Sequence, residues 1–363
     1  MIPRSVYERS LLHLLAPVRA FLEDDSVSEV LINGPNQIFV ERRGVLERTD
    51  ARFDGEEALL AVLRNAAQFA GKHIDAESPI LESRLPDGSR LSGVLPPLAT
   101  SGPYLCIRRF FQTRLTSEGL VCSGTLTEQA VAALSAMVRG KLNIVVAGGT
   151  GTGKTSLLNW LTGFVPDGER VGVIEDAEEV QPQHGHVFQL AARQADEDGR
   201  GAVSIRDLFR ASLRMRPDRV IVGEIRGGEA LDMVQAMVSG HGGCLATLHA
   251  SHPRDVLTRL ETMAMASDIA LPLTALRLQI GSGVDAIVQL SRQRSGRRVV
   301  THIVEVLDYD ANAGSYELRD LFCRAYGENE NEGGLVRTGA APRFAERLIE
   351  HGARWPWSEG RSA

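Results

Sequence analysis

Residues 145–161 read VVAGGTGTGKTSLLNWL, and this stretch matches the pattern G-x-x-x-x-G-K-[ST] between an apolar run and a run with helical spacing. Glycines at such a turn let successive backbone N–H groups point at an anion, and the helix that follows adds its positive N-terminal end. The stretch therefore predicts a strand, a loop that binds nucleotide phosphates, and a helix. The residues expected to hold the nucleotide are Gly148, Gly149, Thr150, Gly151, Thr152, Gly153, Lys154, Thr155 and Ser156.

Lys154 is one of only three lysines in a chain of 363 residues that carries nearly all its positive charge as arginine. The terminal phosphates of a nucleotide favour a compact point charge on a flexible stem, which an ammonium supplies and a planar guanidinium does not. The hydroxyl of Thr155 is of the kind that binds Mg²⁺ in phosphate-binding loops. These two residues predict a nucleoside triphosphate and Mg²⁺ as ligands.

Outside the loop, helical runs alternate with strands that are apolar along their whole length, such as LNIVVAG, RVGVIED, RVIVGEI and GCLATLHA. Strands of this kind, separated by helices, are typical of a parallel sheet that is covered on both faces. Residues 128–320 are therefore expected to form an α/β domain. The earlier residues alternate short strands and turns around one helical run, which predicts a smaller α+β domain over 1–110. Residues 111–127 are expected to form a linker, and 321–363 a C-terminal tail.

Acidic side chains stand at the ends of two of the apolar strands. Glu175 and Asp176 end one strand, Glu224 ends another, and a third strand carries Thr247 and His249. Ligands of a parallel sheet sit outside the carboxyl ends of its strands, so these side chains are expected to converge on the glycine loop. Nucleotide hydrolysis needs an acid to orient water and one near Mg²⁺, and the sequence offers candidates for both.

The overall charge argues against some classes of function. A net charge of −6 gives no basic field for a nucleic acid backbone, so no direct nucleic acid partner is expected. The motif N-K-x-D, which recognises guanine, is absent because none of the three lysines stands between Asn and x-Asp. The four cysteines show no metal-ligand spacing, and the charged N-terminus resembles neither a signal peptide nor a spanning helix. We therefore expect a cytoplasmic protein.

Four ordered segments, GGTGTGKTS, VIEDAEE, RMRPDRVIVGEIRGGEA and SGHGGCLATLHAS, resemble the motifs of the type II and type IV secretion ATPase superfamily. The N-terminal segments RLPDGSRL and IRRF resemble that family as well, and the resemblance extends from roughly Leu22 to Arg347. It implies a RecA-like P-loop ATPase core behind an α+β N-terminal domain, with ATP and Mg²⁺ as cofactors.

The resemblance also implies roles for single residues. Lys154 and Thr155 would hold phosphates and Mg²⁺, Glu224 would also lie near Mg²⁺, partly through water, and Glu224 and Glu175 would polarise the attacking water. Which of the two acids is the main base is left open. His249 would link the terminal phosphate to domain movement. The family's N-domain arginines, which approach the nucleotide when the domains close, correspond to Arg90, Arg108 and Arg109.

The family's engines are ring hexamers that act on a platform protein of the inner membrane, so the resemblance implies a homohexamer that associates peripherally with that membrane. Phrases such as LPDGSRLSGVLPPLATSGPYLCIRRF are most similar to the subgroup that builds tight-adherence (Flp) pili. A motor of conjugative type IV secretion is the alternative, and a RecA-like nucleic-acid motor is a more distant one.

Overall fold

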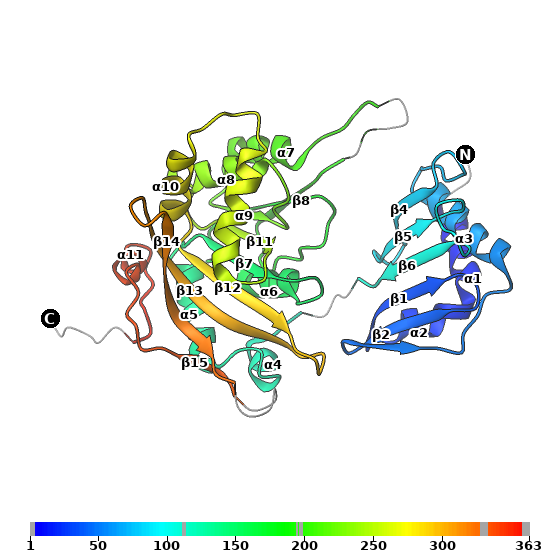
Figure 1. Cartoon of the computed structure of the whole chain (residues 1–363), viewed down its shortest axis with the longest axis horizontal. Coiled ribbons are helices and arrows are strands. Elements are labelled where there is room, and N and C mark those ends of the chain that lie inside the picture. The colour runs from blue at the N-terminus through cyan, green and yellow to red at the C-terminus, as the bar shows by residue number, and fades with distance from the viewer. Residues whose placement is uncertain (1–3, 111–113, 194, 196–198, 327–332, 358–363) are drawn as a thin grey trace. The chain divides into compact units, whose positions relative to one another are not determined.

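The computed structural model describes residues 4–110, 114–193, 195, 199–326 and 333–357 (Figure 1). The chain divides into two compact units. The first comprises residues 1–113 together with 295–297, and the second comprises residues 114–294 and 298–363.

The first unit is an antiparallel sheet of six strands in the order β3-β2-β1-β6-β5-β4, with helices packed on it. The strands are β1 (Val27–Asn33), β2 (Ile38–Arg42), β3 (Val45–Arg48), β4 (Ile80–Arg84), β5 (Arg90–Val94) and β6 (Tyr104–Arg108). The helices are α1 (Arg4–Leu14), the 3-10 turn η1 (Ala16–Val18), α2 (Arg19–Glu23) and α3 (Glu56–Phe69). A side chain at Gly93 would lie 2.1 Å from Leu63 Cδ2, so glycine lets α3 approach β5 closely.

The second unit is built on a sheet of nine strands in the order β15-β14-β13-β12-β7-β11-β10-β8-β9. The strands are β7 (Ile144–Gly148), β8 (Val171–Glu175), β9 (Val187–Ala191), β10 (Arg219–Val222), β11 (Leu245–His249), β12 (Ala286–Arg292), β13 (Arg298–Asp310), β14 (Ser315–Arg324) and β15 (Leu335–Arg337). Six of them, from β12 to β9 in the sheet order, are parallel, and β13 to β15 extend the sheet antiparallel.

Helices cover both faces of this sheet, as the apolar strands predicted (Figure 1). One face packs on α4 (Ser117–Cys122), α5 (Glu128–Arg139), α6 (Lys154–Thr162) and α11 (Ala345–Glu350). The other packs on α7 (Ile205–Ser212), α8 (Glu229–Val238), α9 (Pro253–Met265) and α10 (Leu273–Gly283), and the 3-10 turn η2 (Leu213–Met215) follows α7. Every residue of β7 is buried, because helices lie above and below it. The architecture is α/β with a smaller α+β unit, which confirms the predicted fold class.

The ends of the second unit differ from a plain linker and tail. Helix α4 lies within the expected linker, and its N-cap is Thr116, whose side chain accepts a hydrogen bond from the Gly119 N–H. At the C-terminus, Leu348 and Trp355 are buried in the same core as α5. Residues 333–357 are therefore part of the second unit, because their apolar side chains cover α5.

Among the helices that the structure describes, we find none with both the length and the apolar content needed to cross a membrane.

Candidate functional site

The glycine-rich loop joins the end of β7 to the start of α6. Gly151 and Gly153 have φ values of +69° and +90°, the left-handed region in which other residues are strained. At Gly148 a side chain would lie 2.5 Å from Thr152 Oγ1 and 2.9 Å from the carbonyl oxygen of Leu290. The loop conformation therefore requires glycine at positions 148, 151 and 153, all three within the stretch that the sequence pattern singled out.

Lys154, the first residue of α6, turns back into this loop. Its side chain is buried in the second unit, and its Nζ donates a hydrogen bond of 2.8 Å to the carbonyl oxygen of Gly149. An ammonium held against the loop that precedes its own helix adds a full positive charge to the helix N-terminus. A nucleotide phosphate fits this arrangement, since its oxygens are stronger acceptors than the carbonyl that now occupies the ammonium.

His249 and Glu224 continue from the lysine as a chain of polar contacts. Lys154 Nζ lies 3.3 Å from His249 Nε2, and that nitrogen lies 2.8 Å from Glu224 Oε1. Burial, and then the charge of Lys154, lower the pKa of His249 below its ordinary value. The imidazole is therefore neutral near pH 7. With its proton on Nε2 it donates to the carboxylate of Glu224, and Nδ1, which lies 3.5 Å from Lys154 Nζ, is then the nitrogen that accepts from the ammonium.

The sheet explains why these residues meet. Strand β11 pairs in parallel with β7, and His249 stands opposite Gly148 in that register. Strand β10 is the next neighbour of β11, and Glu224 follows it after one glycine. The expected convergence of Lys154, His249 and Glu224 is thus what the structure shows, and it follows from the carboxyl ends of adjacent parallel strands.

Glu175 ends β8 in a different environment. Its side chain is buried, and its Oε1 accepts hydrogen bonds from the backbone N–H groups of Glu179 (2.9 Å) and Val180 (2.8 Å). It packs so closely on the turn after β10 that a side chain at Gly223 would lie 2.8 Å from Glu175 Cγ. Burial raises the pKa of Glu175 to about 7, although the two backbone hydrogen bonds oppose that rise.

Replacing Glu175 by glutamine should stabilise the protein in a pH-dependent way. Because the folded pKa of about 7 lies above the ordinary glutamate value of 4.5, the unfolded state releases its proton first, and stability falls as pH rises from 4.5 to 7. Above neutral pH, ionisation of the buried carboxyl lowers the free energy of unfolding by on the order of 3 kcal/mol, and glutamine, which does not ionise, avoids this loss. Urea denaturation followed by circular dichroism should therefore show a larger gain at about pH 8.5 than at about pH 5. Exposed Glu118→Gln is the control, and a gain in Glu175→Gln that does not change with pH would contradict the burial argument.

Arg226 is a site residue that the sequence analysis missed. Its Nε lies 2.8 Å and its Nη2 2.5 Å from Glu224 Oε2, and its Nη1 lies 3.5 Å from Asp176 Oδ2. The signal was present, because the arginine follows the strand end within Gly-Glu-Ile-Arg. An apolar pattern predicts where a strand ends, however, but it does not predict where a side chain in the following turn points.

The remaining polar residues of the site differ in role: one bonds to the backbone, and two could serve as ligands of Mg²⁺. Thr247 Oγ1 donates to the carbonyl oxygen of Gly223 at 2.6 Å, so this hydroxyl ties β11 to the turn after β10. Thr155, half-buried in the first turn of α6, and Glu224 supply oxygen donors, which are the donors that Mg²⁺ prefers. No cluster of three or more His, Cys, Asp or Glu side chains that could hold a metal is found in the described part of the chain. A Mg²⁺ site needs no such cluster, because this ion usually binds through one or two protein groups together with phosphate oxygens.

The three N-terminal arginines belong to the first unit. Arg90 stands opposite Arg108 across β5 and β6, and Arg108 Nε donates to Glu29 Oε1 at 2.9 Å. Arg109 is nearly buried, and its guanidinium donates to the carbonyl oxygens of Asp24 and Val27. Within this unit Arg109 therefore stabilises the turn that precedes β1.

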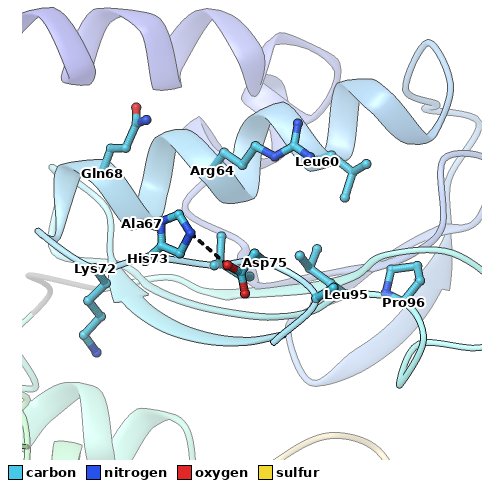
Figure 2. A pocket seen from close by; sticks show the side chains of 11 residues that line it. Leu60, Arg64, Ala67, Gln68, Lys72, His73, Asp75, Leu95 and Pro96 are labelled. Carbon is cyan, nitrogen blue, oxygen red and sulfur yellow. Dashed lines mark hydrogen bonds and ion pairs between the residues drawn. The ribbon is translucent and has the colours of Figure 1, made fainter. Parts of the chain in front are cut away.

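The first unit also contains a hollow of about 400 Å³ beside the C-terminal half of α3 (Figure 2). Its wall includes His73 and Asp75, whose ring nitrogen and carboxylate lie 3.0 Å apart, as the dashed line in Figure 2 marks. Lys72 at its rim donates to the carbonyl oxygen of Glu82. His73 and Asp75 pair with each other, and none of the residues that line the hollow belongs to a glycine loop, so it does not resemble the site at Lys154.

Comparison with known proteins places this chain in a family. The model of the family described as "Type II/IV secretion system protein" matches residues 13–319. The conjugal transfer protein TrbB of Rhizobium radiobacter is 33% identical over 78% of this chain and 85% of its own length. The type IV secretion system protein PtlH of Bordetella pertussis is 33% identical over 81% of this chain and 93% of its own length.

Two solved structures share the fold. The ATPase DotB of Legionella pneumophila aligns with a TM-score of 0.54 and 21% identity over 86% of this chain and 82% of its own. The pilus retraction motor PilT with bound ADP aligns with a TM-score of 0.53 and 17% identity over 94% of this chain and 96% of its own. The family match spans most of both units, and the chain therefore belongs to the type II/IV secretion system protein family, with the RecA-like P-loop fold of its secretion ATPases.

Proposed function

We propose that this protein is an ATPase motor that hydrolyses ATP with Mg²⁺ and uses the energy to drive pilus assembly or secretion across the cell envelope. The observation that carries the proposal is the chain of contacts from Lys154 through His249 to Glu224 at the glycine loop. A phosphate cradle, a cation and a carboxylate at one sheet edge are the parts that phosphoryl transfer to water requires.

In the proposed mechanism, backbone N–H groups of the loop and the ammonium of Lys154 hold the terminal phosphates. Thr155 would hold Mg²⁺, with Glu224 reaching it partly through water, and the ion would neutralise charge on the phosphate oxygens. Glu224 also orients the attacking water. His249 lies between this carboxylate and Lys154, so it senses whether the ammonium is engaged by the loop or by a phosphate.

Of the two acids, we assign Glu224 as the main water-orienting residue. Its carboxylate is connected to Lys154 through a single imidazole, whereas Glu175 bonds to the backbone of its own following loop. Glu175 then supports the turn after β10 and stays a candidate for the second acid. From the first unit, we keep Arg90 and Arg108 as proposed partners of the transferred phosphate, and for Arg109 the buried contacts support a structural role.

Two machines suit such a motor. The segment LPDGSRLSGVLPPLATSGPYLCIRRF favours the tight-adherence pilus, while the names of TrbB and PtlH favour conjugation or type IV secretion as the second candidate. Deleting the gene should abolish surface pili in the first case and DNA or effector transfer in the second. In both, the partner is a platform protein of the inner membrane, and the motor is cytoplasmic and peripheral to that membrane.

The proposal also includes a homohexamer. A ring would let nucleotide binding at successive sites move the two units of each chain and transmit that motion to the platform protein. Light scattering with a non-hydrolysable ATP analogue should therefore give a mass near six times 39.4 kDa. Full activity from a protein that stays monomeric under the assay conditions would contradict this model. Hydrolysis that requires added DNA would instead favour a nucleic-acid motor.

A further inference from the structure

The turn between Glu224 and α8 is held by a side chain of the helix itself. Glu229 opens α8, is buried, and its Oε1 accepts hydrogen bonds from the backbone N–H groups of Arg226 (2.7 Å) and Gly227 (2.8 Å). Two backbone donors on one buried oxygen fix the path of the chain through the turn. The side chain that leaves from that turn, Arg226, therefore starts from a fixed backbone position.

From this position Arg226 reaches back to Glu224. Its Nε and Nη2 both meet Oε2 of the carboxylate, at 2.8 and 2.5 Å. The other oxygen, Oε1, faces His249 Nε2 at 2.8 Å. A carboxylate has about four lone-pair sites. These contacts occupy both sites on Oε2 and one on Oε1, so the site left for a water is on Oε1, beside His249.

We propose that Arg226 is a positioning residue for Glu224, and that Glu229 directs it. This inference rests on the proposed function, because it assumes that Glu224 orients the attacking water. By saturating Oε2, Arg226 leaves the water one acceptor site, on the side of the carboxylate that faces His249 and, through it, Lys154. Without the arginine the carboxylate would turn about its side-chain bonds and offer water several sites, of which one is productive.

The guanidinium suits this task better than an ammonium would. Two of its N–H groups lie in one plane and meet one oxygen together, whereas an ammonium makes a single directed contact. Its third nitrogen, Nη1, lies 3.5 Å from Asp176 Oδ2 at the end of β8, which steadies the fork from the far side. Arg226 thus bridges the two acidic strand ends that the sequence picked out.

The first test is Arg226→Gln and Arg226→Lys in the full-length chain, with steady-state hydrolysis and the affinity for a fluorescent ATP analogue as readouts. We expect kcat to fall at least about tenfold in Arg226→Gln, while KM and the affinity stay within about twofold, because Arg226 touches Glu224 and not the phosphate loop. Arg226→Lys should give an intermediate rate, since it keeps the charge and loses the fork. Arg343→Gln is the matched control, because Arg343 is an exposed arginine paired with Asp308.

The second test examines Glu229 through its conservative variant. Glu229→Gln keeps a carbonyl oxygen for the two backbone N–H groups, and Glu229→Ala removes it. We expect Glu229→Ala to lower kcat toward the level of Arg226→Gln, and Glu229→Gln to restore most of that loss. If Glu229 acts through Arg226, the double variant Arg226→Gln/Glu229→Ala should be no slower than Arg226→Gln alone.

Several results would overturn the inference. They are an unchanged kcat in Arg226→Gln, a KM that rises as much as kcat falls, and further loss when Glu229→Ala is added. Thermal unfolding of each variant shows whether a lower rate reflects loss of the fold. If Glu229→Ala does not fold, the role of Glu229 is still tested by Glu229→Gln, which should keep most of the activity. Failure of the proposed function is distinguishable, since the unmodified protein would then show no hydrolysis of ATP at all.

Discussion

Replacing Lys154 by alanine should abolish nucleotide retention, with affinity for ATP falling by at least about a hundredfold, as measured by the fluorescence of a bound ATP analogue. The ammonium donates a hydrogen bond of 2.8 Å to the carbonyl oxygen of Gly149 within the glycine loop. Its loss removes a full positive charge from the loop, whereas the backbone N–H groups and the helix terminus contribute only partial charges. Hydrolysis should fall with the affinity.

The chain offers a matched control for this change. Lys72 lies in the first unit and donates to a backbone carbonyl, that of Glu82, as Lys154 donates to Gly149. Lys72→Ala should bind ATP with nearly unchanged affinity. Nucleotide binding that survives Lys154→Ala and is lost in Lys72→Ala would show that the phosphates bind elsewhere.

Replacing Glu224 by glutamine should separate binding from turnover. We expect ATP affinity within about twofold of the unmodified protein and a rate of hydrolysis at least about tenfold lower. The reason is that the amide still offers an oxygen to Arg226 or His249 but no longer carries the charge that draws the proton of the attacking water. Single-turnover hydrolysis, compared with equilibrium binding of the same nucleotide, measures both quantities.

Exposed Glu118→Gln controls for the loss of one carboxylate elsewhere in the second unit. If ATP affinity in Glu224→Gln fell as much as the rate, Glu224 would be a binding group and its assignment as the water-orienting residue would be wrong. If the rate in Glu175→Gln fell further than that of Glu224→Gln, the roles of the two acids would be reversed.

The sequence predicted the parts of the site that depend on strand ends. The glycines are constrained by steric contact and backbone conformation, as at Gly148 and Gly153, so they leave a recognisable pattern. Glu224 and His249 could be placed together because neighbouring parallel strands end at one edge of a sheet. These residues could be predicted without knowing how the side chains pack.

The parts that could not be predicted depend on directions within turns and on distant packing. Arg226 and Glu229 are two ordinary charged residues in a turn, and their contacts arise only from the path that the turn takes. The burial of Leu348 and Trp355 against α5 joins residues that are about two hundred positions apart, which no local period records. The different surroundings of Glu175 and Glu224 likewise follow from packing, because both residues simply follow an apolar strand in the sequence.

The contact between Lys154 and the carbonyl oxygen of Gly149 has a consequence for the thermodynamics of nucleotide capture. A lysine side chain that becomes ordered only when its ligand arrives loses rotamer freedom worth about 1.5–2 kcal/mol at that moment. Here the side chain is buried and already held against the loop by its hydrogen bond to Gly149, so most of that entropy is lost when the chain folds. An arriving phosphate exchanges one oxygen for another at an ammonium that hardly moves, and the favourable electrostatic term then appears largely undiminished in the affinity.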